Sequence, residues 1–131
     1  MLLLGPLYHL TERTSRVAAL AEARRVVRPG GLVAAIGISR FASILDGLKR
    51  HFLYDPAFRR LMERVLMDGQ HRSAPERGCY FTTAYFHHPD ELGAEVTDAG
   101  LIHEGTLGIQ GPLWLLQDFE EQWADPSVGN T

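Results

Sequence analysis

The feature that most constrains this chain is the pattern of its first 38 residues, in which an amphipathic segment lies between two apolar runs. The runs are Met1–Leu4 and Leu32–Ile38. The segment between them ends in the Arg-Pro-Gly-Gly turn of Arg28–Gly31, which stops a helix and lets the chain reverse. Neither run alternates apolar with polar residues, which is typical of strands buried on both faces of a parallel sheet. The pattern predicts a strand, a crossover helix and a second strand.

The composition limits the class of protein. The chain has 131 residues, the length of one domain or part of one, and 45% of them are hydrophobic. A net charge of -3 and scattered arginines argue against a nucleic-acid partner. No apolar run approaches the roughly 20 residues of a membrane-spanning helix, and a single cysteine, Cys79, favours a reducing compartment. We therefore expect a cytoplasmic protein with no membrane partner.

Apolar residues at helical spacing predict further helices along the chain. The crossover helix is expected to begin after Thr11 as its N-cap, and another after Asp55, whose neighbour Pro56 suits a first helical turn. The later helices are expected at 41–52, 55–68, 88–100 and 112–123. Between them, 70–78 is expected to form a loop or lid, 80–86 an aromatic cluster, and 101–111 a strand broken at its glycines.

The loop Gly5–His9 is the first candidate for function, because open α/β sheets bind ligands at the carboxyl ends of their strands. Tyr8 and His9 lie just past such an end. The alternative is that both side chains only cap the sheet and pack on neighbouring loops. The spacing of His87 and His88 does not fit a metal site, and His88 is expected at a helix start. The spaced glycines of 105–111 do not match a dinucleotide-binding loop.

Three stretches together resemble class I S-adenosylmethionine-dependent methyltransferases. They are LLLGPLYHL at 2–10, the helix and turn ALAEARRVVRPGG at 19–31, and YFHHPDELGAEVTDAGL at 85–101. The similarity lies in the second half of the Rossmann-like domain of that family and covers most of the chain, to about Trp123. The resemblance implies methyl transfer to a small-molecule acceptor with S-adenosylmethionine as cofactor.

The resemblance also assigns candidate site residues. The loop matching Gly5–His9 flanks the methionine end of the cofactor in the family, so Gly5, Pro6 and Leu7 are implied as cofactor neighbours. Tyr8 and His9 are implied as the catalytic residues near the methyl acceptor, with His9 as a base. The substrate-side candidates are Arg40, Phe41 and Tyr85. No metal is implied.

Two parts of the family pattern have no counterpart here: the glycine-rich loop after the first strand and the acidic residue that ends the second strand. The expected fold is therefore α/β, an incomplete Rossmann-like domain with about three strands covered by helices. It lacks the cofactor-binding half that is N-terminal in the family. Its expected parts are a strand–helix–strand unit (1–38), a helical cap or lid (39–78), a helix–strand–helix region (79–123) and a polar tail (124–131).

Three functions follow from these observations. The first is a truncated small-molecule methyltransferase, possessing only part of the cofactor site. The second is a non-catalytic methyltransferase-like module that binds a partner, because the strand Met1–Leu4 would present a bare apolar edge. That edge predicts a homodimer or pairing with a complementary segment. The third, a dehydrogenase half, lacks a dinucleotide fingerprint.

Overall fold

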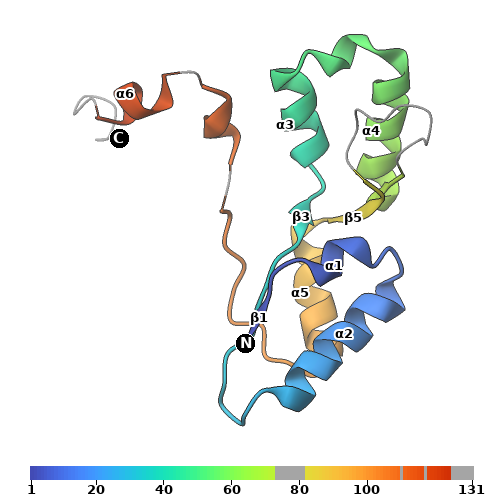
Figure 1. Cartoon of the computed structure of the whole chain (residues 1–131), viewed down its shortest axis with the longest axis vertical. Helices are drawn as coiled ribbons and strands as arrows, with labels where there is room; N and C mark the ends of the chain where they lie inside the picture. The colour runs from blue at the N-terminus through green and yellow to red at the C-terminus, as the bar shows by residue number, and fades with distance from the viewer. Residues whose placement is uncertain (73–81, 110, 117, 125–131) are drawn as a thin grey trace.

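The computed structural model describes residues 1–72, 82–109, 111–116 and 118–124. It is a mixed α/β structure in which helices pack around two small open sheets (Figure 1). The elements are β1 (Leu2–Leu3), α1 (Pro6–His9), α2 (Arg13–Val26), β2 (Ala34–Ala35), β3 (Ile38–Ser39), α3 (Ala42–Lys49), the 3-10 helix η1 (Phe52–Tyr54), α4 (Pro56–Asp68), β4 (Gln70–His71), β5 (Ala84–His87), α5 (Pro89–Asp98), the 3-10 helix η2 (Pro112–Leu115) and α6 (Phe119–Ala124).

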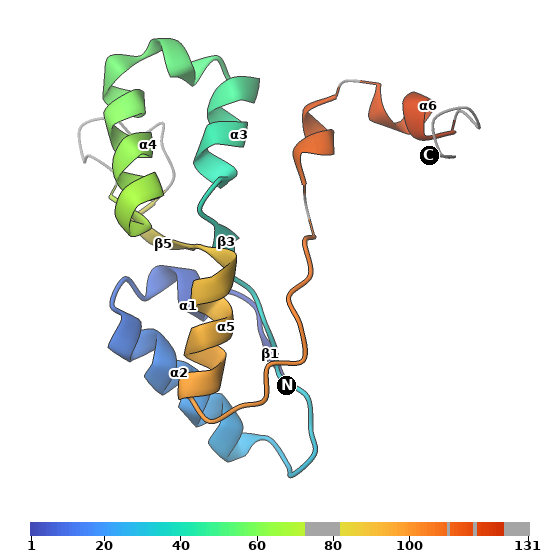
Figure 2. The same cartoon turned by 180° about the vertical axis from the view of Figure 1, so that it is seen from behind.

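The first sheet is formed by β1 and β2, which pair in parallel with α2 connecting them. This pairing agrees with the strand–helix–strand pattern of the sequence. Leu2 lies opposite Ala34, and the Ala34 N–H donates to the Met1 carbonyl at 2.9 Å. One face of this sheet packs on α1, α2 and α5, around a core built on Leu7, Leu20 and Ala99. Figure 2 shows these helices together on one side of β1.

The opposite face of this sheet is uncovered, which corrects the expectation of strands buried on both faces. Leu2 is 70% exposed and Leu32 is 76% exposed, whereas Leu3 and Ala35 pack into the core. Side chains alternate between the two faces of a strand, and only one face here has helices against it. The regular pairing of β2 is also shorter than the apolar run 32–38, because β3 turns away to join the second sheet.

The second sheet has the strand order β3-β5-β4, with β5 parallel to β3 and antiparallel to β4. Its central strand, β5, is buried along its whole length. Leu61 and Val65 of α4 pack against Ala84 and Phe86 of β5, with Ala42 of α3 at the edge of this cluster. The sequence predicted an aromatic cluster in this region but no strand, so β5 is the main element that the sequence analysis missed.

Two helix boundaries test the capping predictions. At α4 the prediction is confirmed, because the Asp55 carboxylate accepts a hydrogen bond from the Ala57 N–H at 2.8 Å. Gly69 ends this helix in the left-handed conformation with φ 73°. At α2 the prediction is wrong by one residue, because Glu12 and not Thr11 is the N-cap, and no side chain caps that end.

The segment after α5 differs from the sequence prediction. Residues 101–109 contain no strand, and Ile102, Leu107 and Ile109 are each more than 80% exposed. No strand of either sheet pairs with this part of the chain, so its backbone has no ladder to join. The helix expected over 112–123 is divided into η2 and α6. Figure 1 shows this segment leading away from the two sheets.

Some predictions lie outside the described residues. They concern Cys79, the aromatic residues Tyr80 and Phe81, most of the lid at 70–78, and the polar tail after Ala124. The first two residues of that stretch form β4, where the sequence predicted a loop. In the ranges that the structure describes, no helix is long and apolar enough to cross a membrane.

Candidate functional site: the Tyr8–His9 turn and the buried network behind it

The turn after β1 begins at Gly5, whose φ of 151° is a conformation that side chains rarely adopt. Pro6 then opens a single helical turn, α1, where the sequence predicted a loop. Leu7 is fully buried and anchors this turn in the core. Tyr8 folds back over Gly5, since a Cβ at Gly5 would lie 3.5 Å from the Tyr8 hydroxyl. Tyr8 is half-buried and His9 is exposed.

The rings of Tyr8 and His9 lie together, with centroids 4.6 Å apart and planes tilted by 55°. Both stand at the carboxyl end of β1, the position predicted for a ligand in an open α/β sheet. The turn therefore presents an aromatic ring and an imidazole side by side. Leu7, which was predicted as a cofactor neighbour, is directed into the core instead.

Arg16 secures the chain immediately after this turn. Its Nη1 donates to the carbonyls of Leu10 and Thr11 at 2.9 and 2.8 Å. The same guanidinium binds the Glu95 carboxylate through Nη2 at 2.6 Å and through Nε at 3.0 Å. Arg16 and Glu95 are 2% and 1% exposed, so this ion pair is shielded from water. It connects α2, α5 and the end of the Tyr8–His9 turn.

Glu95 also contacts His87, the last residue of β5, with 3.2 Å between His87 Nε2 and Glu95 Oε2. Burial by itself would raise the pKa of Glu95, but hydrogen bonds from His87 and Arg16 outweigh it and lower that pKa. The other ring nitrogen, His87 Nδ1, is buried and has no hydrogen-bond partner among the residues that the structure describes. It faces Gly37, where a Cβ would come within 2.8 Å of it.

A second ion pair joins Arg40 to Glu91 beside the first. Arg40 Nη2 donates to the two Glu91 carboxylate oxygens at 2.8 and 2.6 Å and to the Tyr85 hydroxyl at 3.2 Å. The Tyr85 hydroxyl in turn donates to Glu91 at 3.0 Å. The Arg16 guanidinium carbon lies 3.5 Å from the centroid of the Tyr85 ring, so this ring connects the two pairs.

These contacts shift the pKa values of Tyr85 and Glu91 in opposite directions. Burial, followed by the hydrogen bond and charge of Glu91, raises the pKa of Tyr85. Burial would also raise the pKa of Glu91, but bonds from the His88 N–H, Tyr85 and Arg40 lower it. At neutral pH the hydroxyl is therefore a neutral donor and the carboxylate an ionised acceptor. We call Arg16, Arg40, Tyr85, His87, Glu91 and Glu95 the buried network.

The three substrate-side candidates differ in how far they are exposed to solvent. Arg40 and Tyr85 are 9% and 8% exposed and bind each other within the buried network. Phe41 is 46% exposed, and its ring meets the edge of the His88 ring at a centroid distance of 6.2 Å. Of these three side chains, Phe41 is the one that is open to a ligand.

Sequence reasoning missed Arg16 and Glu95, although the helix pattern carried a signal for both. Arg16 precedes Leu20 and Ala23 at helical spacing, on the side of α2 that is buried. Glu95 lies between Leu92 and Ala99 on the packed side of α5 in the same way. A charged residue on the apolar side of each of two neighbouring helices indicates a buried ion pair, because an unpaired buried charge is strongly unfavourable.

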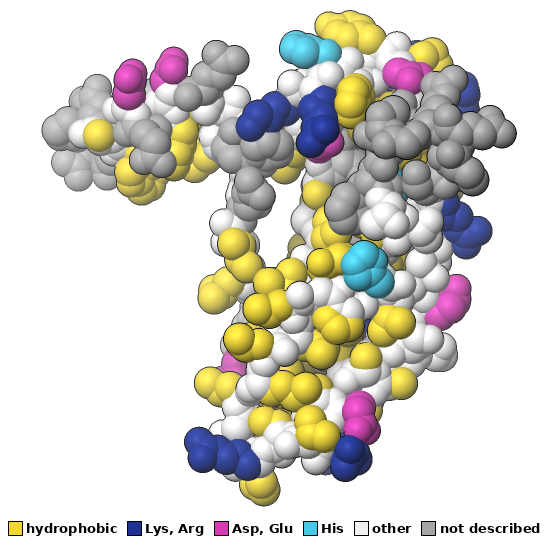
Figure 3. Space-filling model, in the orientation of Figure 1, with side chains coloured by type: hydrophobic (Ala, Val, Ile, Leu, Met, Phe, Trp, Pro, Cys, Tyr) yellow, Lys and Arg dark blue, Asp and Glu magenta, His cyan; other side chains and the backbone are white. Residues whose placement is uncertain are grey.

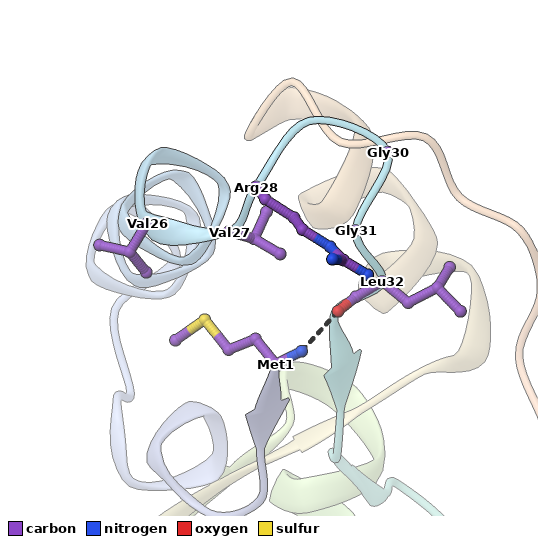
Figure 4. Close-up of a pocket in the computed structure, with 7 residues that line it drawn as sticks. All are labelled: Met1, Val26, Val27, Arg28, Gly30, Gly31 and Leu32. Atoms are coloured by element: carbon purple, nitrogen blue, oxygen red, sulfur yellow. Dashed lines mark hydrogen bonds between the residues drawn. The ribbon is translucent and has the colours of Figure 1, made fainter.

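The protein has a further hollow at the other end of the first sheet. An open pocket of ≈ 900 Å³ is lined by the end of α2, the turn after it and Met1 (Figure 4). The terminal amine of Met1 donates to the Leu32 carbonyl at 2.6 Å beside this pocket. It lies at the amino ends of β1 and β2, away from the Tyr8–His9 turn. In the described part of the chain, no group of three metal-ligating side chains is present.

Comparison of the chain with protein-family models, with curated protein sequences and with solved structures found no match.

Proposed function

We propose that this chain forms the acceptor side of an S-adenosylmethionine-dependent methyltransferase that acts on a small molecule. The observation that carries the proposal is the position of the Tyr8–His9 turn. It directly follows the first of two parallel strands joined by a crossover helix. In open α/β sheets that position binds ligands, and the resemblance of 2–10, 19–31 and 85–101 gives the ligand its chemical class.

The residues at the turn fit one end of this cofactor. Gly5 leaves its backbone without a side chain, and the half-buried ring of Tyr8 offers a π-face to a sulfonium cation. The carboxylates of Glu91 and Glu95 are already held by Arg40 and Arg16, so neither is free to bind the ammonium group or the ribose hydroxyls of the cofactor. We therefore assign to this chain only the contacts with the sulfonium group and the carbon chain beside it. When bound, the cofactor would supply an electrophilic methyl group.

The remaining roles belong to residues of the chain. His9, exposed next to Tyr8, accepts the proton that the acceptor loses. Phe41 provides an apolar contact for the acceptor. Arg16 positions the turn through the Leu10 and Thr11 carbonyls, which matters because correct placement of two reactants can lower the barrier of such a reaction substantially.

Amide chemical shifts of the isotopically labelled chain test this proposal, because they detect binding even in the millimolar range. S-Methylmethionine carries the sulfonium and methionine groups without the nucleoside, and adenosine carries the nucleoside alone. We expect S-methylmethionine to shift the amides of Gly5, Leu7, Tyr8 and His9, and adenosine to leave them unchanged. Tyr8→Ala should abolish the response. Tyr54→Ala, which removes a tyrosine that is 86% exposed on η1, should preserve it.

Two results would refute the proposal. One is the absence of any shift at the turn with either S-methylmethionine or S-adenosylmethionine at millimolar concentration. The other is a response confined to the pocket near Gly30 and Leu32, which would move the ligand to the wrong end of the sheet.

A further inference from the structure

We infer that the pocket at the amino ends of β1 and β2 binds a small aliphatic carboxylate. This inference does not rest on the proposed function, which concerns the opposite end of the same sheet. The pocket is open and has a volume of ≈ 900 Å³, within the range of small-molecule sites. In Figure 3 hydrophobic and basic side chains lie together at the lower end of the molecule, where Figure 1 draws the turn after α2. These two kinds of side chain indicate a ligand with an apolar part and an anionic part.

Arg28 is the charged side chain that such a ligand would meet. Two other arginines lie near the end of α2, and both are engaged elsewhere. Arg25 pairs with Glu22, and the guanidinium of Arg24 covers Gly100, where a Cβ would lie 2.9 Å from the Arg24 Nη1. Arg28 is exposed and lines the pocket, and none of the carboxylates that the structure describes pairs with it. A guanidinium donates two parallel hydrogen bonds to a carboxylate, so Arg28 is suited to hold the anionic part of the ligand.

The turn after α2 holds the Arg28 side chain beside the pocket. A Cβ at Gly31 would lie 2.8 Å from Val27 Cγ2 and 3.2 Å from Arg28 Cγ. Because Gly31 has no side chain, the carbon chain of Arg28 can lie against the backbone of the turn. Figure 4 shows the Arg28 side chain extended toward Leu32, with the Met1 side chain below it. The close packing at Gly31 therefore places the guanidinium next to the apolar walls of the pocket.

The apolar walls of the pocket would contact a hydrocarbon chain. Met1, Val26 and Leu32 line it, and they are 48%, 52% and 76% exposed. Among the described residues that line the pocket, no side chain is acidic. A hydrocarbon chain that covers these walls removes apolar surface of both partners from water. A ligand with an alkyl chain and one carboxylate therefore matches the pocket better than inorganic phosphate, which has no apolar part.

Amide chemical shifts of the isotopically labelled 131-residue chain, titrated with sodium hexanoate, test this inference. We expect shifts at the pocket amides of 27, 28 and 30–32, and none at Tyr8 or His9. The affinity should rise from acetate through butanoate to hexanoate, by up to about fourfold for each added methylene. Hexan-1-ol has the same number of carbons but no charge, so it should bind several-fold more weakly than hexanoate.

Three variants separate the charged contact from the apolar one. Arg28→Gln should weaken hexanoate binding to the level of hexan-1-ol. Arg25→Gln is the matched control, because it removes the same charge from a neighbouring position that already pairs with Glu22, and it should preserve hexanoate binding. Leu32→Ser keeps Arg28 but removes an apolar wall, so it should reduce the gain in affinity from acetate to hexanoate. All three positions are exposed, so circular dichroism should show unchanged helix content.

Four results would overturn the inference. The first is the absence of shifts at the pocket amides with hexanoate at millimolar concentration. The second is unchanged hexanoate binding by Arg28→Gln, which would remove Arg28 from the site. A response to inorganic phosphate as strong as that to hexanoate would make the pocket a general anion site. Loss of hexanoate binding in a chain acetylated at Met1 would place the charged contact on the terminal ammonium, which donates to the Leu32 carbonyl at 2.6 Å.

Discussion

Replacing Glu95 by Gln should be among the most destabilising single changes in this protein. Glu95 is 1% exposed, and it balances the charge of Arg16, which is 2% exposed. The neutral amide keeps the size of the side chain and can still accept a hydrogen bond. It removes the negative charge, so the Arg16 guanidinium is left buried without a counter-ion. The perturbation therefore isolates the ion pair from the packing around it.

The expected loss of stability in Glu95→Gln follows from the burial of this ion pair. Breaking a buried ion pair by removing one partner costs about 3–5 kcal/mol. That is a large part of the total stability of a small domain, about 5–15 kcal/mol. The matched control is Glu22→Gln, because Glu22 pairs with Arg25 on the outer face of the same α2 helix, with side chains 60% and 70% exposed. Surface pairs of this kind contribute little, so no measurable loss is expected there.

Urea unfolding followed by circular dichroism measures both variants. For Glu95→Gln the midpoint should fall by roughly 2 M, given a slope of about 1–3 kcal/mol per molar urea. The double variant Arg16→Met with Glu95→Gln should recover part of this loss, because it removes the unpaired charge. A midpoint for Glu95→Gln that matches Glu22→Gln would refute the argument that the pair is shielded from water.

The pH dependence gives a second measurement of the same pair. The folded-state pKa of Glu95 lies below its ordinary value of 4.5. Its contribution to stability is therefore fully present above pH 4.5 and is lost as the pH falls through the lower folded value. In Glu95→Gln this contribution is absent, so the variant should lose less stability than the wild type over that acid range. An identical acid response in both proteins would contradict the assignment.

Three further changes test other parts of the fold. Burial lowers the pKa of His71 below its ordinary value of 6.5. The contribution of neutral His71 to the free energy of unfolding should therefore be fully present above pH 6.5 and be lost as the pH falls below it. His71→Phe should weaken this pH dependence in urea melts over a series of pH values. Gly69→Ala should lower the free energy of unfolding by at least about 1 kcal/mol more than Gly30→Ala does. Both glycines have φ 73°, but a Cβ at Gly69 would lie 2.6 Å from the Phe86 carbonyl oxygen, whereas a Cβ at Gly30 would lie in open space. Equal losses in thermal melts would contradict this reasoning. Asp55→Ala should cost about 0.5–2 kcal/mol of unfolding free energy, and Asp55→Ser should restore most of it by accepting the same N–H bond.

Local sequence signals predicted local structure well. Asp55 and Pro56 set the start of α4, and Gly69 set its end, because capping and left-handed turns depend on neighbouring residues alone. The turn at Arg28–Gly31 separated α2 from β2 for the same reason. His88 begins α5 as expected and serves as its N-cap. These features need no information from distant parts of the chain.

Features that depend on distant residues were predicted less well. β5 is a strand because β3 and β4 hydrogen-bond to it from both sides, and its sequence showed only a cluster of aromatic residues. Residues 101–109 have the composition of a strand but no partner strand, so they form no regular structure, and 102–109 are exposed. Apolar content alone therefore missed the strand at β5 and predicted a strand after α5 that does not form.

The sequence by itself determined where α4 begins and ends, where α5 begins, that two apolar runs flank a crossover helix, and that Tyr8 and His9 follow the first run. Only the tertiary structure decided which of those apolar residues are covered. Helices pack on one face of the first sheet, so Leu3 is in the core and Leu2 faces outward. It also decided that Arg16 meets Glu95, 79 residues later in the chain, because a buried charge is stable only where folding brings its counter-ion to it.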